Sequence, residues 1–172
     1  MTLHADLLEQ ARHLATRERK KPKQASLRRA VSASYYALFH LILDSGSRQF
    51  TSDKQLRLLV PRAFVHSEMK KAAKTFASGG TLPANIRAVY SGVIPVELKK
   101  VAQAFVDLQE ARHKSDYDLN TTFTRSEVED LVSVAEEAFA CWKAVQAMPA
   151  ERSGVELFLI SMLLWERWHK SV

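Results

Sequence analysis

The fold of this chain is decided by the stretch Arg28-Arg-Ala-Val-Ser-Ala-Ser-Tyr-Tyr-Ala-Leu-Phe-His40. The stretch contains neither glycine nor proline, and its apolar residues recur at helical spacing, so it predicts a helix. At about 100° per residue, one face of that helix collects Leu27, Ala30, Val31, Ser34, Leu38, Leu41 and Ile42. The opposite face collects Arg29, Ala33, Tyr36 and His40. This second, polar stripe is the first place to look for function.

Further helices are expected on both sides of this stretch, and they are separated by short breakers. The apolar periodicity predicts helices over residues 3–20, 24–44, 54–77, 95–118, 125–147 and 154–168. The breakers between them are Lys21-Pro22-Lys23, Ser45-Gly46-Ser47, Ser78-Gly79-Gly80 and an irregular connection over 81–94 with one short helical turn. Pro61 either opens the third helix or divides a short turn from it. Thr124, with Glu127 three residues later, forms a capping-box pattern for the helix over 125–147.

This pattern of consecutive helices predicts an all-α protein. Because the connections are short, we expect an antiparallel up-and-down bundle of four to five core helices. The last helix is apolar around much of its circumference, which is typical of a buried or interface helix. We therefore expect one domain over residues 1–172, with residues 150–172 forming a C-terminal packing or oligomerisation helix.

Composition narrows the function classes. Cys141 is the single cysteine, which excludes an intramolecular disulfide and a cysteine zinc cluster. The sequence has no glycine-rich phosphate loop and no His-x-x-x-His pair, so we expect neither a cofactor nor a metal. There is no apolar leader, and no apolar run approaches the roughly 20 residues that span a bilayer. These observations predict a cytoplasmic protein without a membrane partner.

Charge is distributed unevenly along the chain. Residues 1–114 carry 20 Lys and Arg against 9 Asp and Glu, whereas residues 115–172 carry 5 against 10. The densest basic run lies between Arg17 and Arg29 and contains one acidic residue, Glu18. Such a run either follows a phosphate backbone or is a solvated helix junction. The candidate RNA- or phosphate-binding residues are Lys20, Lys21, Arg28, Arg29 and Lys114.

A second polar feature lies at the end of the helix over 95–118. Its core stripe of Leu98, Val101, Phe105 and Leu108 continues to Arg112, and Asp116 follows four residues later, at the spacing of an Arg–carboxylate pair. This pair either anchors the bundle or, with His113, Lys114 and Tyr117, forms a cationic cleft for phosphate. If the helices over 24–44 and 95–118 are neighbours, Arg112, Asp116 and Tyr36 meet in one polar network.

The two motifs together resemble the HEPN superfamily (higher eukaryotes and prokaryotes nucleotide-binding), in particular its small uncharacterised prokaryotic branch. The resemblance rests on the stretch from Arg29 to His40, which contains a Ser32-x-x-Tyr-Tyr core, and on Ala111-Arg-His-Lys-Ser-Asp-Tyr-Asp118, and it spans roughly residues 5–145. It implies a dimeric helical bundle. Many members bind or cleave RNA, often as toxins paired with a nucleotidyltransferase-like antitoxin.

Catalytic members of that superfamily carry an arginine and, after four to six intervening residues, a histidine on the same helix. Here His113 follows Arg112 directly, and neighbouring helical residues diverge by about 100°. The candidates for a variant catalytic site are Arg112, His113, Asp116, Tyr117 and His40. We therefore expect a non-catalytic HEPN-like module that binds RNA, a nucleotide or a protein as a dimer. The alternatives are a metal-independent endoribonuclease and an interaction protein working through its last helix.

Overall fold

The computed structural model describes residues 2–79 and 82–169, and this part of the chain contains helices and no strand. The predicted all-α class is thus confirmed. The α-helices are α1 (Leu3–Thr16), α2 (Gln24–Phe50), α3 (His66–Ala77), α4 (Ala84–Arg87), α5 (Val96–Tyr117), α6 (Arg125–Gln146) and α7 (Arg152–His169). Three 3-10 turns, η1 (Leu56–Leu58), η2 (Val60–Ala63) and η3 (Pro149–Glu151), lie between them.

The chain divides into two compact units. The first unit consists of Met1–Leu41 and Ala104–Ala140, and the second of Ile42–Gln103 and Cys141–Val172. Helices α2, α5 and α6 each contribute residues to both units. The two units are described separately below.

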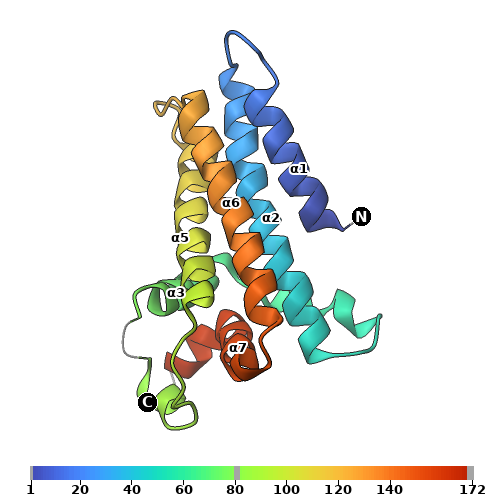
Figure 1. Cartoon of the computed structure of the whole chain (residues 1–172), viewed down its shortest axis with the longest axis vertical. Coiled ribbons are helices and arrows are strands. Elements are labelled where there is room, and N and C mark those ends of the chain that lie inside the picture. Colours follow the sequence, from blue (N-terminus) through green and yellow to red (C-terminus); the bar gives the residue numbers. More distant parts are fainter. Residues whose placement is uncertain (1, 80–81, 170–172) are drawn as a thin grey trace. The chain divides into compact units, whose positions relative to one another are not determined.

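The first unit is an antiparallel helical bundle of α1 with parts of α2, α5 and α6, which run side by side in alternating directions (Figure 1). Its core is rich in small side chains. Alanines at these positions allow neighbouring helices to approach closely. The buried cluster contains Ala11, Ala15, Leu27, Ala30, Val31, Ala33, Val128 and Val132. The predicted up-and-down bundle therefore matches the arrangement of this unit.

The capping box at the start of α6 forms as predicted. The Thr124 amide donates to Glu127 Oε2 at 2.7 Å, and the Glu127 amide donates back to Thr124 Oγ1 at 3.3 Å. These two bonds satisfy backbone donors that have no partner within the helix. They fix the point at which α6 begins.

Helix α1 is shorter than predicted, because it ends at Thr16 and not near residue 20. Lys20 and Lys21 consequently lie on an exposed connection between α1 and α2. Glu18 orders this connection by accepting hydrogen bonds from Ser26 Oγ at 2.8 Å and from the Lys23 amide at 3.4 Å. The basic run is thus a connection that the bundle holds in place.

Helix α2 is longer than predicted, because it passes through Ser45-Gly46-Ser47 and ends at Phe50. These small residues serve packing in the second unit. Ser45 Oγ accepts a hydrogen bond from Trp142 Nε1 at 3.0 Å. Gly46 is buried, and a Cβ placed on it would lie 2.9 Å from Phe64 Cζ. The sequence signal of a helix end was therefore wrong, since close packing also requires small side chains.

The expected division of α2 into a core face and a separate polar surface is also wrong in the first unit. Ala33 is buried and Tyr36 and His40 are half-buried, so that Arg29 is the one exposed member of the polar stripe. On the adjacent face Tyr35 is fully buried, and its ring lies 5.6 Å from the Phe105 ring. Helix α2 is therefore a central helix of this unit.

Helix α7 is a core element of the second unit. It packs on α3, where the Phe76 and Phe158 rings meet edge to face at 5.1 Å. Phe158, Leu159, Met162 and Trp165 are all buried. These apolar side chains of α7 are thus covered within the second unit. An interaction surface on the last helix stays a prediction. Among the described helices, none is both long and apolar enough to cross a membrane.

Candidate nucleic-acid interface

Arg112 is the centre of a polar cluster in the first unit. From α5 its Nε lies 2.7 Å from Asp116 Oδ2, one helical turn away, and its Nη2 donates to Tyr36 Oη of α2 at 2.9 Å. The guanidinium carbon lies 5.5 Å from the centre of the Tyr36 ring and 5.4 Å from that of Tyr117. The predicted network of Arg112, Asp116 and Tyr36 therefore forms, with Tyr117 as a further member.

Two serines to which the sequence analysis gave no role hold the carboxylate of this cluster. Ser32 Oγ of α2 donates to Asp116 Oδ1 at 2.6 Å, and it lies 3.2 Å from Ser115 Oγ. Both serines are buried. Ser32 precedes Tyr36 by four residues, so the two side chains leave α2 on the same face. The four-residue spacing of Ser32 and Tyr36 is the sequence pattern that could have shown that both side chains face the Arg112–Asp116 pair.

The Arg112 guanidinium keeps its positive charge. Burial opposes the charge of the Arg112 guanidinium, but nearby Tyr36, Asp116 and Tyr117 outweigh this effect and raise its pKa above the ordinary value. The Arg112 and Asp116 side chains are 23% and 26% exposed, so water reaches the pair. The cluster is therefore an anchored but partly open arginine site.

The structure separates the two histidines that were catalytic candidates. His113 is exposed, and its ring contacts that of Tyr117 at 5.1 Å. His40 is half-buried on α2, where its ring lies 6.4 Å from that of Tyr36. Burial, and then the proximity of His4, lower the pKa of His40 below its usual value. His40 is consequently neutral at pH 7.

Arg28, a predicted phosphate-binding residue, is used to hold the bundle together. Its guanidinium donates to the backbone carbonyls of Ser115 and Asp118, at 2.7 and 2.9 Å, and to that of Thr121. The same guanidinium also lies over the Phe123 ring. These bonds connect the start of α2 to the end of α5, and they leave Arg28 few donors for a ligand.

Arg125 fixes the basic connection to the same end of the bundle. It is the first residue of α6, and its guanidinium donates to the carbonyls of Glu18 and Arg19. The connection between α1 and α2 therefore lies beside the start of α6. Together with the Arg28 contacts, this places residues 17–29 and 112–127 at one end of the first unit, the upper end in Figure 1.

At this end of the first unit, the acidic side chains have hydrogen-bond partners, whereas several basic side chains have no ion-pair partner among the described residues. Segments 17–29 and 112–127 carry ten basic and four acidic side chains, and this excess equals the +6 net charge of the whole chain. Hydrogen bonds from Ser26, Thr121 and the Thr124 amide are the main causes that lower the pKa values of Glu18, Asp118 and Glu127, respectively. By contrast, Lys20, Lys21 and Arg29 are exposed and have no ion-pair partner within the described ranges 2–79 and 82–169. We call these three residues the basic cluster.

Lys114 lies on a different surface from the basic cluster. It lines a groove of about 460 Å³ between α5 and α6, whose floor includes Phe123 and Leu131. Acidic side chains, Asp107 and Asp130 among them, line the same groove. A phosphate approaching Lys114 would meet these carboxylates, so Lys114 is a poorer phosphate contact than the basic cluster.

Where the structure describes the chain, no three His, Cys, Asp or Glu side chains are grouped so that they could hold a metal ion. Comparisons with protein-family models, with curated proteins and with solved structures find no match to this chain. The interpretation of the site therefore rests on its own geometry and on the resemblance of its motifs.

Proposed function

We propose that this chain is a non-catalytic HEPN-like module that binds RNA through one end of its first unit and works as a dimer. The observation that carries this proposal is the basic cluster: three exposed cations, without ion-pair partners in the part of the chain that the structure describes, stand where the acidic side chains are already hydrogen-bonded. A phosphate backbone would supply the missing negative charges and release counterions on binding. The dimeric state and the superfamily are parts of the proposal that rest on the resemblance of the motifs.

Aromatic side chains beside the cations favour a single-stranded ligand. Tyr117 is 64% exposed, and it carries the Arg112 guanidinium on one side of its ring and the His113 ring nearby. Bases of single-stranded RNA stack on such rings while lysines and arginines follow the phosphates. A cationic end with an exposed tyrosine fits this mode better than it fits an acidic protein, which would not need the ring.

The test is a titration of fluorescein-labelled single-stranded RNA, followed by fluorescence anisotropy at several salt concentrations. The triple variant K20Q/K21Q/R29Q removes the basic cluster. The control K54Q/R62Q/K143Q removes three exposed cations of the second unit and gives the same net charge. If all three lost cations contact phosphates, the slope of log K against log salt should become shallower by about 2. Equal loss of affinity in both variants, or binding that does not depend on salt, would refute the proposal.

A metal-independent endoribonuclease is the second candidate, because His40 and Arg112 both border the Tyr36 ring. His40 is held neutral, as a general base must be, and Arg112 is a permanent cation. Incubation of RNA with the purified protein and a chelator tests this activity. Cleavage that H40N abolishes, in a protein of unchanged stability, would overturn the non-catalytic proposal. Cleavage would also favour a paired nucleotidyltransferase-like antitoxin as the partner.

A further inference from the structure

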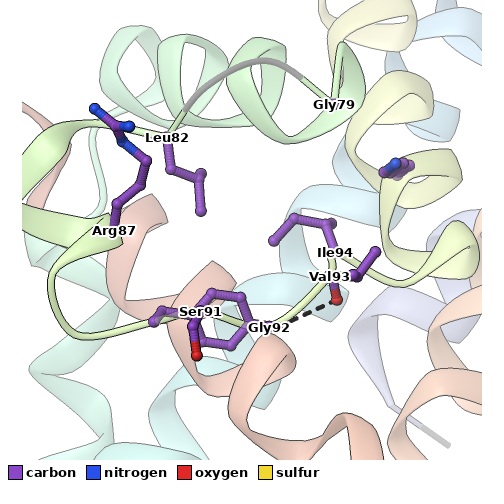
Figure 2. A pocket seen from close by; sticks show the side chains of 9 residues that line it. Gly79, Leu82, Arg87, Ser91, Gly92, Val93 and Ile94 are labelled. Carbon is purple, nitrogen blue, oxygen red and sulfur yellow. Dashed lines mark hydrogen bonds between the residues drawn. The ribbon is translucent and has the colours of Figure 1, made fainter.

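The second unit contains a pocket that plays no part in the proposed RNA interface. It has a volume of about 520 Å³ and lies where the chain passes from α3 to α5 (Figure 2). Its wall includes Gly79 after α3, Arg87 of α4, the loop of residues 90–94 and Lys99 of α5. A volume of this size is typical of a site for a small molecule.

Two glycines shape the wall of this pocket around Tyr90. A Cβ placed on Gly92 would lie 2.7 Å from Tyr90 Cζ and Oη, and one placed on Gly154 would lie 3.1 Å from Tyr90 Oη. Only residues without a side chain allow the tyrosine to lie so close. Its hydroxyl donates to the Val93 carbonyl at 3.3 Å, which closes the loop, and burial raises the pKa of Tyr90 so that the proton is retained.

The charged side chains of the described lining are all positive. Among the described residues, Arg87 and Lys99 belong to the lining and no carboxylate does, and neither cation has an ion-pair partner there. The Lys99 ammonium lies 3.3 Å from the position of a Cβ on Gly79, at the end of α3. The negative end of the α3 dipole favours a cation there. The Tyr90 and Ser91 hydroxyls add uncharged polar groups to the same wall.

Apolar side chains complete the pocket. In Figure 2 the side chains of Leu82 and Ile94 point into the hollow from different sides, and Arg87 stands at its rim. A simple inorganic anion would use the cations but would leave these apolar surfaces exposed to water. The lining therefore combines recognition of an anionic group with recognition of an apolar body.

We propose that this pocket binds a small organic phosphate, with the phosphate attracted by the positive lining to which Arg87 and Lys99 belong and the apolar part against Leu82 and Ile94. The site is independent of the RNA interface, because all its residues belong to the second unit. The proposal assigns no reaction to the site. It predicts that both parts of the ligand contribute to affinity.

Phenyl phosphate is the probe, and isothermal titration calorimetry at low salt measures its binding. We expect a Kd of about 1 mM or tighter. Inorganic phosphate and phenol, each of which lacks one half of the probe, should bind at least about tenfold more weakly, a factor that corresponds to about 1.4 kcal/mol. If inorganic phosphate binds as tightly as phenyl phosphate, the assignment of an organic ligand is wrong.

Variants locate the binding site. R87Q and K99Q should each weaken phenyl phosphate binding at least about fivefold, because each removes one positive charge from the lining. K54Q removes an exposed lysine of the same unit that does not line the pocket, so it should leave the affinity unchanged. Arg87 is exposed, so R87Q tests the site without disturbing the core. No binding at about 10 mM, or equal weakening by all three variants, would overturn the proposal.

Discussion

Replacement of Arg112 by alanine should destabilise the first unit by about 3 kcal/mol. The change removes an ion pair at 2.7 Å, a hydrogen bond of 2.9 Å to Tyr36 and two ring contacts at 5.4 and 5.5 Å. The partly exposed ion pair contributes about 1 kcal/mol or less, and the bond from a charged donor about 1.5 kcal/mol. Each ring contact contributes about 0.5 kcal/mol at a site that water reaches. Asp116 keeps its bonds to Ser32 and Ser115, which limits the loss.

The assay uses the uneven distribution of tryptophan between the two units. Trp142, Trp165 and Trp168 all belong to the second unit, so their fluorescence reports on that unit alone. Far-ultraviolet circular dichroism reports on the helices of both units. Urea unfolding of R112A, followed by both probes, should show an early loss of ellipticity. If the units unfold independently, the tryptophan transition should stay in place.

Other variants of the first unit provide the control for R112A and the result that would refute its anchoring role. R29A removes an exposed arginine of α2 that has no ion-pair partner among the described residues, and it should change the free energy of unfolding by less than about 0.5 kcal/mol. A double-mutant cycle with D116N should give a coupling energy of about 1 kcal/mol. If R112A costs less than about 1 kcal/mol, the cluster does not stabilise the bundle, and the anchoring role of Arg112 is refuted.

Three further changes test other parts of the fold. Thr124→Ala removes the bond from the Glu127 amide to Thr124 Oγ1 in the capping box and should cost about 1 kcal/mol, measured by urea unfolding followed by circular dichroism. Gly46→Ala should cost about 1 kcal/mol in the tryptophan-detected transition, because the clash with Phe64 exceeds the gain in helix propensity; the same change in a Phe64→Leu background should then cost nothing. Burial lowers the pKa of His40, so the neutral form is favoured in the folded state. The contribution of His40 to the free energy of unfolding is therefore complete above about pH 6.5, and it is lost as the pH falls from there through the lowered pKa. His40→Gln should reduce this loss of stability, measured by unfolding experiments from about pH 8 to about pH 5.

Local patterns predicted those parts of the structure that depend on neighbours in the sequence. The Thr124–Glu127 capping box and the Arg112–Asp116 pair join residues three or four positions apart, so helical geometry alone sets their contacts. The contact between Tyr36 and Arg112 crosses two helices. The sequence predicted it only on the condition that the helices over 24–44 and 95–118 are neighbours, which no local pattern determines.

Features that depend on distant residues were not predictable. Ser45-Gly46-Ser47 has the composition of a helix end, and only Phe64 and Leu159, which lie far away in the sequence, show that Gly46 is a packing residue. In the same way, Arg28 looks like one more cation of the basic run. Its carbonyl partners lie about 90 residues away, so the sequence could not show that its donors are occupied.

Cations whose donors already bind groups of the protein differ in their expected roles from cations that have no such partner among the described residues. Arg28, Arg112 and Arg125 bind groups of their own bundle, so their loss should reduce RNA binding only by unfolding the first unit. Lys20 and Lys21 bind no such groups among the residues described, so their loss should reduce RNA binding and leave unfolding unchanged. RNA affinity measured at a low temperature, at which R112A is still folded, separates these roles. If R112A then loses as much affinity as the variant of the basic cluster, the arginine contacts phosphate directly, and the interface extends over Tyr117 to the Arg112 cluster.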